Sequence, residues 1–227
     1  MKCKRIVLRV IVPVLIICVA FTAAGVLGAR SLTDIESNLF EKGTKLVEKG
    51  KLADAVDVFK RLNQRKPHFL GPYFFLANIY SQMGDYRGVI EICKKALKRF
   101  SLQVRKIARP SLKNPIYSQL YYRLGTAYLN LGRYDEAVDA FRLILKSHNY
   151  KVPNYSWLKF YSNVPSKAEE FYIPVHFNLG SAYLSLGDKE AALGQYKKLQ
   201  ALDKGKSEEL YKLINQVENK KNYRGGN

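Results

Sequence analysis

Apolar and small residues recur in the same order in four segments of this chain. The segments read KGTKLVEKGKLADAVDVF (42–59), LANIYSQMGDYRGVIEIC (76–93), LGTAYLNLGRYDEAVDAF (124–141) and LGSAYLSLGDKEAALGQY (179–196). Each has a small residue, an apolar or aromatic residue three positions later, and a glycine four positions after that. Fixed internal spacing of this kind is the signature of a repeat architecture.

Two amphipathic helices are predicted in each segment, because apolar residues three and four positions apart lie on one side of a helix. In the third copy, the stripe on the first helix is Leu120, Leu124, Ala127, Tyr128 and Leu131. The stripe on the second helix is Tyr134, Ala137, Val138, Phe141, Ile144 and Leu145. Gly132 is expected to end the first helix, and Gly125 to let the two helices approach closely. One pair cannot bury both stripes alone, so the copies are expected to stack.

These motifs resemble the tetratricopeptide repeat (TPR), a 34-residue unit of two antiparallel helices. The resemblance covers residues 36–206 apart from two insertions, and the third and fourth copies are the most specific. It implies an all-α fold, a right-handed TPR solenoid of antiparallel helix pairs. The repeats are expected near 36–69, 70–103, 118–151 and 173–206, with insertions at 104–117 and 152–172. A last apolar stripe predicts a capping helix at 207–221 within a C-terminal segment, 207–227, that ends in a basic tail.

An uncharged run of twenty residues, Val10 to Ala29, follows a short basic N-terminus. A helix of this length spans about 30 Å, the thickness of the hydrocarbon core of a bilayer. The apolar part of a cleavable signal peptide is usually only about 7 to 15 residues long. Residues 1–30 are therefore predicted to form one transmembrane signal-anchor helix, followed by a linker at 31–35. The small residues between Ala23 and Ala29 leave open the alternative that a signal peptidase releases a secreted domain.

The charges on either side of this run predict its orientation. The cations before it are Lys2, Lys4, Arg5 and Arg9. After it, Arg30 is followed by acidic residues and the positive excess is lost. The positive-inside rule then places the N-terminus in the cytoplasm and the repeat domain outside it, in the periplasm if the cell is Gram-negative.

The formal net charge of the whole chain is +19, which favours anionic partners. Between Ile92 and Tyr134 there is no acidic residue. The cations of this stretch expected to contact anionic lipid or an acidic protein surface are Lys94, Lys95, Lys98, Arg99, Arg105, Lys106, Arg109 and Lys113. Arg123 and Arg133 belong to the same stretch. Nucleic acid is the poorer candidate, because the sequence contains no nucleic-acid-binding motif.

The TPR resemblance implies a groove, because the first helices of successive TPR repeats line a concave face that binds a peptide or a helix. The predicted groove has an aromatic row, Phe40, Phe74, Tyr122 and Phe177, and a small polar row, Thr44, Asn78, Thr126 and Ser181. Rings give contact area at low entropy cost, and the polar groups can bond to a backbone. The alternative is that the rings pack between helices. The chaperone-binding subclass, which holds a carboxylate with Lys and Asn clamps, does not fit, because Phe40 and Thr44 stand at two clamp positions.

The second insertion is rich in aromatic residues. They are Tyr155, Trp157, Phe160, Tyr161, Phe171 and Tyr172. So many rings are expected to pack on the repeat domain, and their presentation to a partner is the alternative.

The sequence predicts no catalytic residue, no metal site and no cofactor. The three cysteines form no CxxC pair, which argues against a zinc site and against a disulfide framework. The three histidines are scattered and none adjoins a recognisable nucleophile motif. Cys93 occupies the position of Phe141 in the third copy, so a buried core thiol is expected.

These features together predict a membrane-anchored adaptor, not an enzyme. It would bind a protein partner through the concave face and help to assemble or localise an envelope complex. The alternative is a basic membrane-surface or polyanion-binding module that acts through residues 92–134.

The predicted topology can be tested with protease. Protease added to intact spheroplasts should digest residues 31–227, because the repeat domain is expected outside the cytoplasmic membrane. Digestion that occurs only in permeabilised cells would show that the domain faces the cytoplasm.

Overall fold

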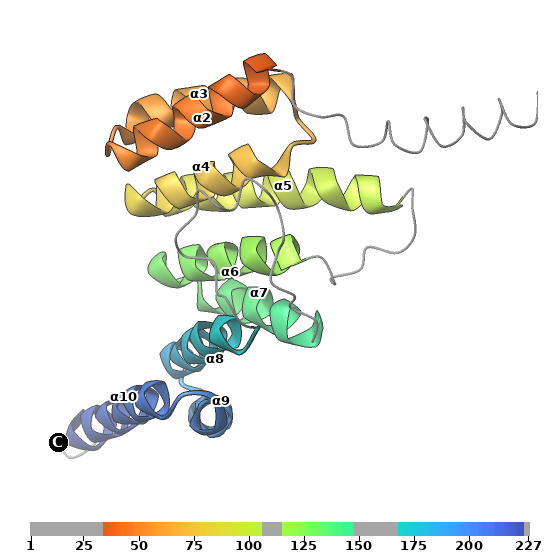
Figure 1. Ribbon diagram of the computed structural model, residues 1–227. Helices are drawn as coiled ribbons and strands as arrows, with labels where there is room; N and C mark the ends of the chain where they lie inside the picture. The colour runs from red at the N-terminus through yellow and green to blue at the C-terminus, as the bar shows by residue number, and fades with distance from the viewer. Residues whose placement is uncertain (1–33, 106–114, 148–167, 225–227) are drawn as a thin grey trace, which may run out of the picture. The chain divides into compact units, whose positions relative to one another are not determined.

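The computed structural model describes residues 34–105, 115–147 and 168–224, and the regular secondary structure in these ranges is α-helical (Figure 1). The helices are α2 (Asp34–Glu48), α3 (Leu52–Arg65), α4 (Leu70–Gln82), α5 (Tyr86–Arg105), α6 (Pro115–Asn130), α7 (Tyr134–Ser147), α8 (Ala168–Ser185), α9 (Lys189–Leu202) and α10 (Lys204–Arg224). The chain divides into two units, residues 1–38 and 39–227, and the packing described below is that of the second unit. The all-α prediction is confirmed for the described ranges.

The helices pack in chain order from α3 to α10, each against the next (Figure 1). In addition, α4 contacts α6, α6 contacts α8, and α8 contacts α10, so the first helices of successive pairs are neighbours. This is the contact pattern of stacked helix pairs in a solenoid. Because α10 contacts both α8 and α9, it occupies the place that the first helix of a further pair would take. It therefore caps the last pair.

A glycine with positive φ follows the first helix of each pair. At Gly132 φ is 70°, a left-handed conformation that other residues rarely adopt. The N–H of Arg133 then donates to the carbonyl oxygen of Tyr128 at 2.9 Å, which satisfies a carbonyl group at the helix end. Gly50, Gly84 and Gly187 have the same conformation. These four glycines are the ones that define the repeat in the sequence.

A second set of small residues permits close approach of neighbouring helices. A Cβ atom at Gly125 in α6 would lie 2.7 Å from Cε1 of Phe141 in α7, which is well inside van der Waals contact. Gly180 in α8 differs, because its nearest neighbour is Leu210 of α10, at 2.6 Å from a Cβ atom placed there. Leu210 of the capping helix α10 therefore packs against Gly180, whereas Phe141 of the second helix α7 packs against Gly125.

Buried apolar side chains form a core between the pairs. The largest cluster extends over α4 to α8 and includes Cys93, which is fully buried as predicted. Burial raises the pKa of the Cys93 thiol to about 12, the reverse of what a reactive thiolate requires. A second cluster joins α2, α3 and α4 around Phe40, Phe59 and Phe75, and a third joins α8, α9 and α10 around Leu210.

Helix α8 begins five residues before the predicted start of the fourth repeat at 173. Phe171 lies in this extension and is buried, with its ring edge-on to Tyr122 and the two centroids 5.9 Å apart. Burial of such a ring contributes about 1.5 to 3 kcal/mol, which helps to explain why the helix extends this far. The first residues of α6 and α10 each precede the predicted boundaries, 118 and 207, by three positions.

Several sequence-based predictions fall outside the described residues. Packing on the repeat domain is confirmed for Phe171 and Tyr172, whereas Tyr155, Trp157, Phe160 and Tyr161 lie outside the described ranges. The predicted anchor also lies outside them, within residues 1–33. Among the helices that the structure describes, none combines the length and apolar character that a membrane crossing needs.

Replacing Gly125 with leucine should destabilise the fold, whereas the same change at Gly194 should not. Any side chain at 125 presses on the buried Phe141 ring, and overpacking of this kind costs about 1 to 3 kcal/mol. A Cβ atom at Gly194 would meet no neighbouring side chain or helix within 4 Å. Leucine has a higher helix propensity than glycine, so this change should raise the free energy of unfolding by about 0.5 to 1 kcal/mol. Urea denaturation of both variants checks this. Equal unfolding free energies would contradict the close crossing of α6 and α7.

Candidate functional site

The eight predicted groove residues lie at equivalent positions of the first helices α2, α4, α6 and α8, but they differ in exposure. The buried ones are Phe40, Thr44 and Phe74. The partly exposed ones are Asn78, Tyr122, Thr126, Phe177 and Ser181. The two rows therefore do not form an open channel lined by all eight side chains.

Each ring in the first half of the aromatic row packs against the next first helix. The Phe40 ring of α2 meets the Phe75 ring of α4 edge-on, with centroids 5.4 Å apart. The Phe74 ring of α4 lies against the guanidinium of Arg123 in α6, whose central carbon is 4.6 Å from the ring centroid. Phe40 and Phe74 are only 4% and 1% exposed, so core packing, the alternative in the sequence analysis, describes their position. A direct contact of either ring with a partner stays a prediction.

The two later rings also contact the following helix. The Tyr122 hydroxyl of α6 accepts a hydrogen bond from Nδ2 of Asn178 in α8 at 3.3 Å. The Phe177 ring of α8 lies 4.9 Å from Nζ of Lys206 in α10. Burial raises the pKa of Tyr122, so its hydroxyl stays protonated at neutral pH. The aromatic row thus supplies a contact at every junction from α2 to α10.

The small polar row is mostly engaged within its own helices. Thr44, Thr126 and Ser181 each donate a hydroxyl hydrogen bond to a backbone carbonyl oxygen three or four residues earlier, at 2.8 to 3.0 Å. Asn78 is different, because its Oδ1 accepts a hydrogen bond from Nη1 of Arg123 at 3.3 Å. Through this hydrogen bond, Asn78 makes a polar contact with the next helix pair.

Arg123 is a functional candidate that sequence reasoning assigned only to the basic stretch. Its guanidinium is held by Asn78 and by the Phe74 ring, and burial lowers its pKa to about 10. It therefore keeps its positive charge at pH 7. The sequence does contain a signal for this position. Arg123 directly follows Tyr122 of the aromatic row, and the residue at the equivalent position in α4 is the apolar Phe75.

We define the Arg123 cluster as Phe74, Asn78, Tyr122, Arg123 and Asn178. It spans three successive first helices and offers a guanidinium, a phenol and two amides. These groups bind carbonyl and carboxylate oxygens, and they include no evident general base. In the part of the chain that the structure describes, no group of three or more His, Cys, Asp or Glu side chains could hold a metal ion.

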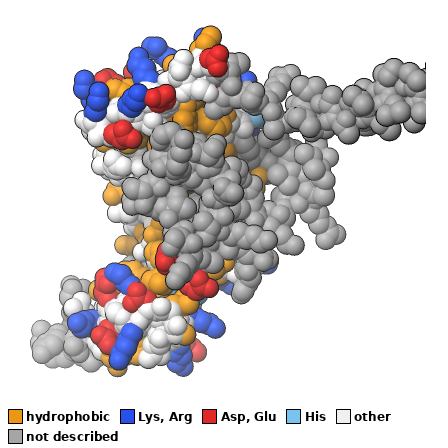
Figure 2. Space-filling view, in the orientation of Figure 1, with side chains coloured by type: hydrophobic (Ala, Val, Ile, Leu, Met, Phe, Trp, Pro, Cys, Tyr) orange, Lys and Arg blue, Asp and Glu red, His pale blue; other side chains and the backbone are white. Residues whose placement is uncertain are grey.

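The predicted anion-contacting cations that the structure describes all belong to α5, and their surroundings differ. On α5, Lys94 lies 5.7 Å from the Tyr128 ring centroid, whereas Lys95 and Arg99 line a separate cleft between α3 and α5. Lys98 and Arg105 also belong to α5. The remaining three, Lys106, Arg109 and Lys113, lie outside the described residues. Figure 2 shows Lys and Arg side chains interspersed with Asp and Glu side chains over the described parts of one face.

A second hollow of about 530 Å³ lies beside α8 and α9 and is lined mainly by apolar atoms of Leu145, Tyr172 and Leu202. His176 lines it, with Nδ1 2.8 Å from Oε1 of Gln195. Burial lowers the pKa of His176, so the ring is neutral at pH 7. A neutral imidazole held by an amide is a structural arrangement and does not identify a reaction.

Comparison with known proteins accounts for the repeats. Sequence models described as "Tetratricopeptide repeat" match residues 70–100, 118–146 and 173–206. Each range covers most of one helix pair, α4–α5, α6–α7 or α8–α9. The TPR motif predicted from the glycine and tyrosine spacing is confirmed.

One curated relative is the Hsp70-Hsp90 organising protein of Plasmodium falciparum, which is 23% identical over 161 residues. The match covers 68% of this chain and 27% of that protein, so the chain spans about a quarter of the relative's length.

Solved structures with the same fold include MamA proteins and kinesin light-chain repeats. A MamA RS-1 double mutant is 14% identical, with a TM-score of 0.57, and the match covers 84% of this chain and 98% of that chain. Another MamA crystal structure is 17% identical, with a TM-score of 0.54 and coverages of 76% and 75%. A variant of TPR-like repeats from a Podosopora anserina putative kinesin light chain is 13% identical, with a TM-score of 0.55 and coverages of 85% and 100%. At these identities the likeness concerns the fold. The described part of this chain is an all-α solenoid, and its residues 70–100, 118–146 and 173–206 match tetratricopeptide repeats.

Proposed function

We propose that this chain is a scaffold that binds a protein partner on the face formed by its first helices, with the Arg123 cluster at the centre. TPR proteins are generally protein-interaction scaffolds. The observation that carries the proposal is the position of the Arg123 guanidinium, 4.6 Å from the Phe74 ring centroid and 3.3 Å from Oδ1 of Asn78. A side chain already held in place loses little conformational entropy when a partner binds.

The chemistry of the cluster fits a partner segment that presents carbonyl or carboxylate oxygens. Arg123 stays protonated at pH 7, and a partly desolvated cation interacts more strongly with an acceptor than a solvated one does. Tyr122 and Asn178 place a hydroxyl and an amide at the next junction. An extended segment could therefore bond to successive helix pairs.

The polyanion-binding alternative has less support from the described cations. Lys94 and Arg133 both lie over the Tyr128 ring, at 5.7 and 4.7 Å from its centroid, and Arg133 also pairs with Glu136. The carboxylate of Glu136 competes with lipid or with an acidic surface for the guanidinium of Arg133. The first-helix face is therefore the better candidate.

Membrane attachment and envelope assembly are a further part of the proposal and rest on the sequence. The uncharged run from Val10 to Ala29 would hold the repeat domain beside the membrane, outside the cytoplasm. A scaffold in that place would help to assemble or localise an envelope complex. Release of a secreted domain by signal-peptide cleavage is the alternative.

Arg123→Gln should weaken partner binding, and Arg133→Gln serves as the matched control. Both arginines lie over an aromatic ring at nearly the same distance, so both variants lose a guanidinium and a cation–π contact. Removal of an arginine at the centre of an interface costs about 2 kcal/mol or more, roughly thirtyfold in affinity.

The measurement is quantitative affinity capture from a detergent extract with the full chain as bait, after circular dichroism has shown that each variant is folded. We expect a specific set of proteins to bind to the wild type and to Arg133→Gln but to be depleted with Arg123→Gln. Equal capture by both variants would contradict the proposed face.

A further inference from the structure

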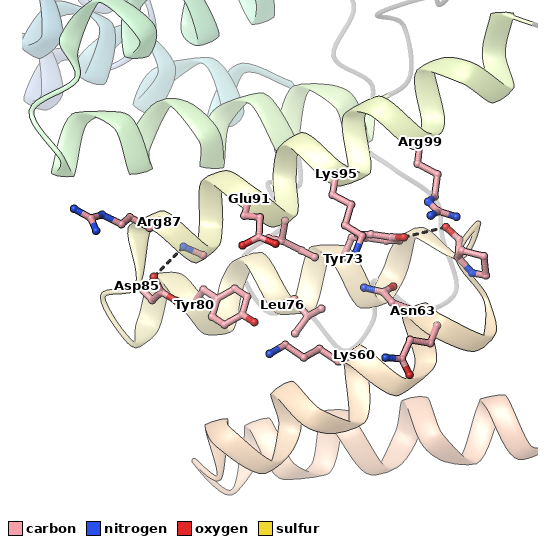
Figure 3. Close-up of a pocket in the computed structure, with 14 residues that line it drawn as sticks. Lys60, Asn63, Tyr73, Leu76, Tyr80, Asp85, Arg87, Glu91, Lys95 and Arg99 are labelled. Carbon is pink, nitrogen blue, oxygen red and sulfur yellow. Dashed lines mark hydrogen bonds between the residues drawn. The ribbon is translucent and has the colours of Figure 1, made fainter.

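A polar cleft of about 690 Å³ lies between the second helices α3 and α5, with α4 as its floor (Figure 3). Its volume is within the range of ligand-binding pockets, about 300 to 1,000 Å³. None of the residues of the Arg123 cluster lines it. The cleft is thus a separate candidate site on the same repeat domain.

One wall of the cleft carries a stripe of charged residues on α5. Arg87, Glu91, Lys95 and Arg99 follow one another at intervals of four residues, and all four line the cleft. Residues four apart lie on the same side of a helix, and the stripe from 87 to 99 is about 18 Å long. This length matches about five residues of an extended peptide.

Cations from two helices line this cleft. Lys60 of α3 lines it opposite Lys95 and Arg99 of α5 (Figure 3). Within the described residues, no carboxylate oxygen lies at ion-pair distance from any of these three side chains. Asp85 and Glu91 also line the cleft, but Lys60, Arg87, Lys95 and Arg99 outnumber them, and this excess of positive charge attracts an anionic ligand.

The floor of the cleft is fixed. Tyr73 of α4 is 1% exposed, and its hydroxyl donates to the carbonyl oxygen of Pro67 at 3.1 Å (Figure 3). At the other end, Oδ1 of Asp85 accepts a hydrogen bond from the N–H of Gly88 at 2.8 Å and so caps α5. The cations therefore project from helices whose positions are held by packing and by hydrogen bonds.

The remaining polar groups favour a peptide over a uniformly charged polyanion. Glu91 stands in the middle of the α5 stripe and would repel a polyphosphate or a nucleic-acid strand. A peptide can place carboxylates beside Lys95 and Arg99 and a neutral residue beside Glu91. The side chain of Asn63 also lines the cleft, and an amide group can form hydrogen bonds with a peptide backbone.

We propose that the cleft between α3 and α5 is a second binding site, which takes an extended acidic peptide segment of a partner protein, with Lys60, Lys95 and Arg99 holding its carboxylates. This site goes beyond the proposed function, which concerns the first-helix face. A chain with both sites could hold two different protein segments at once.

The test uses the full chain and a fluorescein-labelled peptide, Glu-Glu-Gly-Glu-Glu, whose neutral middle residue can lie beside Glu91, followed by fluorescence anisotropy at physiological salt. Lys95→Ala combined with Arg99→Ala should lower the affinity at least about tenfold, because charge-assisted hydrogen bonds are lost. The matched control is Lys197→Ala combined with Lys212→Ala, which removes the same charge from exposed positions of α9 and α10. An equal loss of affinity in both double variants, or no binding by the wild type, would overturn the proposal.

A second pair of variants tests the site from the opposite direction. Glu91→Gln should strengthen binding of the same peptide severalfold, whereas Glu208→Gln on α10 should leave it unchanged. An equal gain in both would show that net charge alone controls binding, and would overturn the proposal. The proposal would also be overturned if a labelled single-stranded oligonucleotide of the same charge bound more tightly than the peptide and lost affinity in the Lys95→Ala, Arg99→Ala variant. Neither result depends on Arg123, so failure of this site and failure of the first-helix face are distinguishable.

Discussion

The packing of each helix pair against the next pair is the interaction on which the rest of this structure depends. A pair such as α6 and α7, with 16 and 14 residues, cannot bury its apolar faces alone, so each pair is stabilised by its neighbours. One position of the first helices contributes to this packing at every junction, from Phe40 against Phe75 to Phe177 against Lys206. Gly125 brings α6 and α7 together within one pair, and the ring at each junction adds a contact between one pair and the next.

The same contact explains where binding chemistry can arise. At the first junction both residues are phenylalanines, and the contact only buries apolar area. At the next junction α6 contributes Arg123, so a ring that would otherwise only pack also holds a cation. The second helices present different chemistry, because the α5 stripe and Lys60 line a cleft that the first helices leave free. Two faces of one stack can therefore serve two kinds of partner segment.

The sequence predicted most of the helix pairs, because their determinants are local. Gly132 and its equivalents need positive φ, and the apolar stripes repeat at helical spacing. Contacts between distant residues were not predictable in this way. Arg123 meets Asn78 across 45 positions, and Gly180 meets Leu210 of the capping helix, so neither contact has a local signal. Phe171 was assigned to an insertion for the same reason, because only the Tyr122 ring shows where it packs.

The most direct test of this account is a double-mutant cycle on Phe74 and Arg123. The unfolding free energies of Phe74→Ala, Arg123→Ala and the double variant are measured by urea denaturation of the full chain. If the ring and the guanidinium stabilise the junction between α4 and α6 together, the coupling energy should be about 0.5 to 2 kcal/mol. Strictly additive effects, with a coupling within about 0.3 kcal/mol of zero, would contradict the claim that this contact joins the repeats.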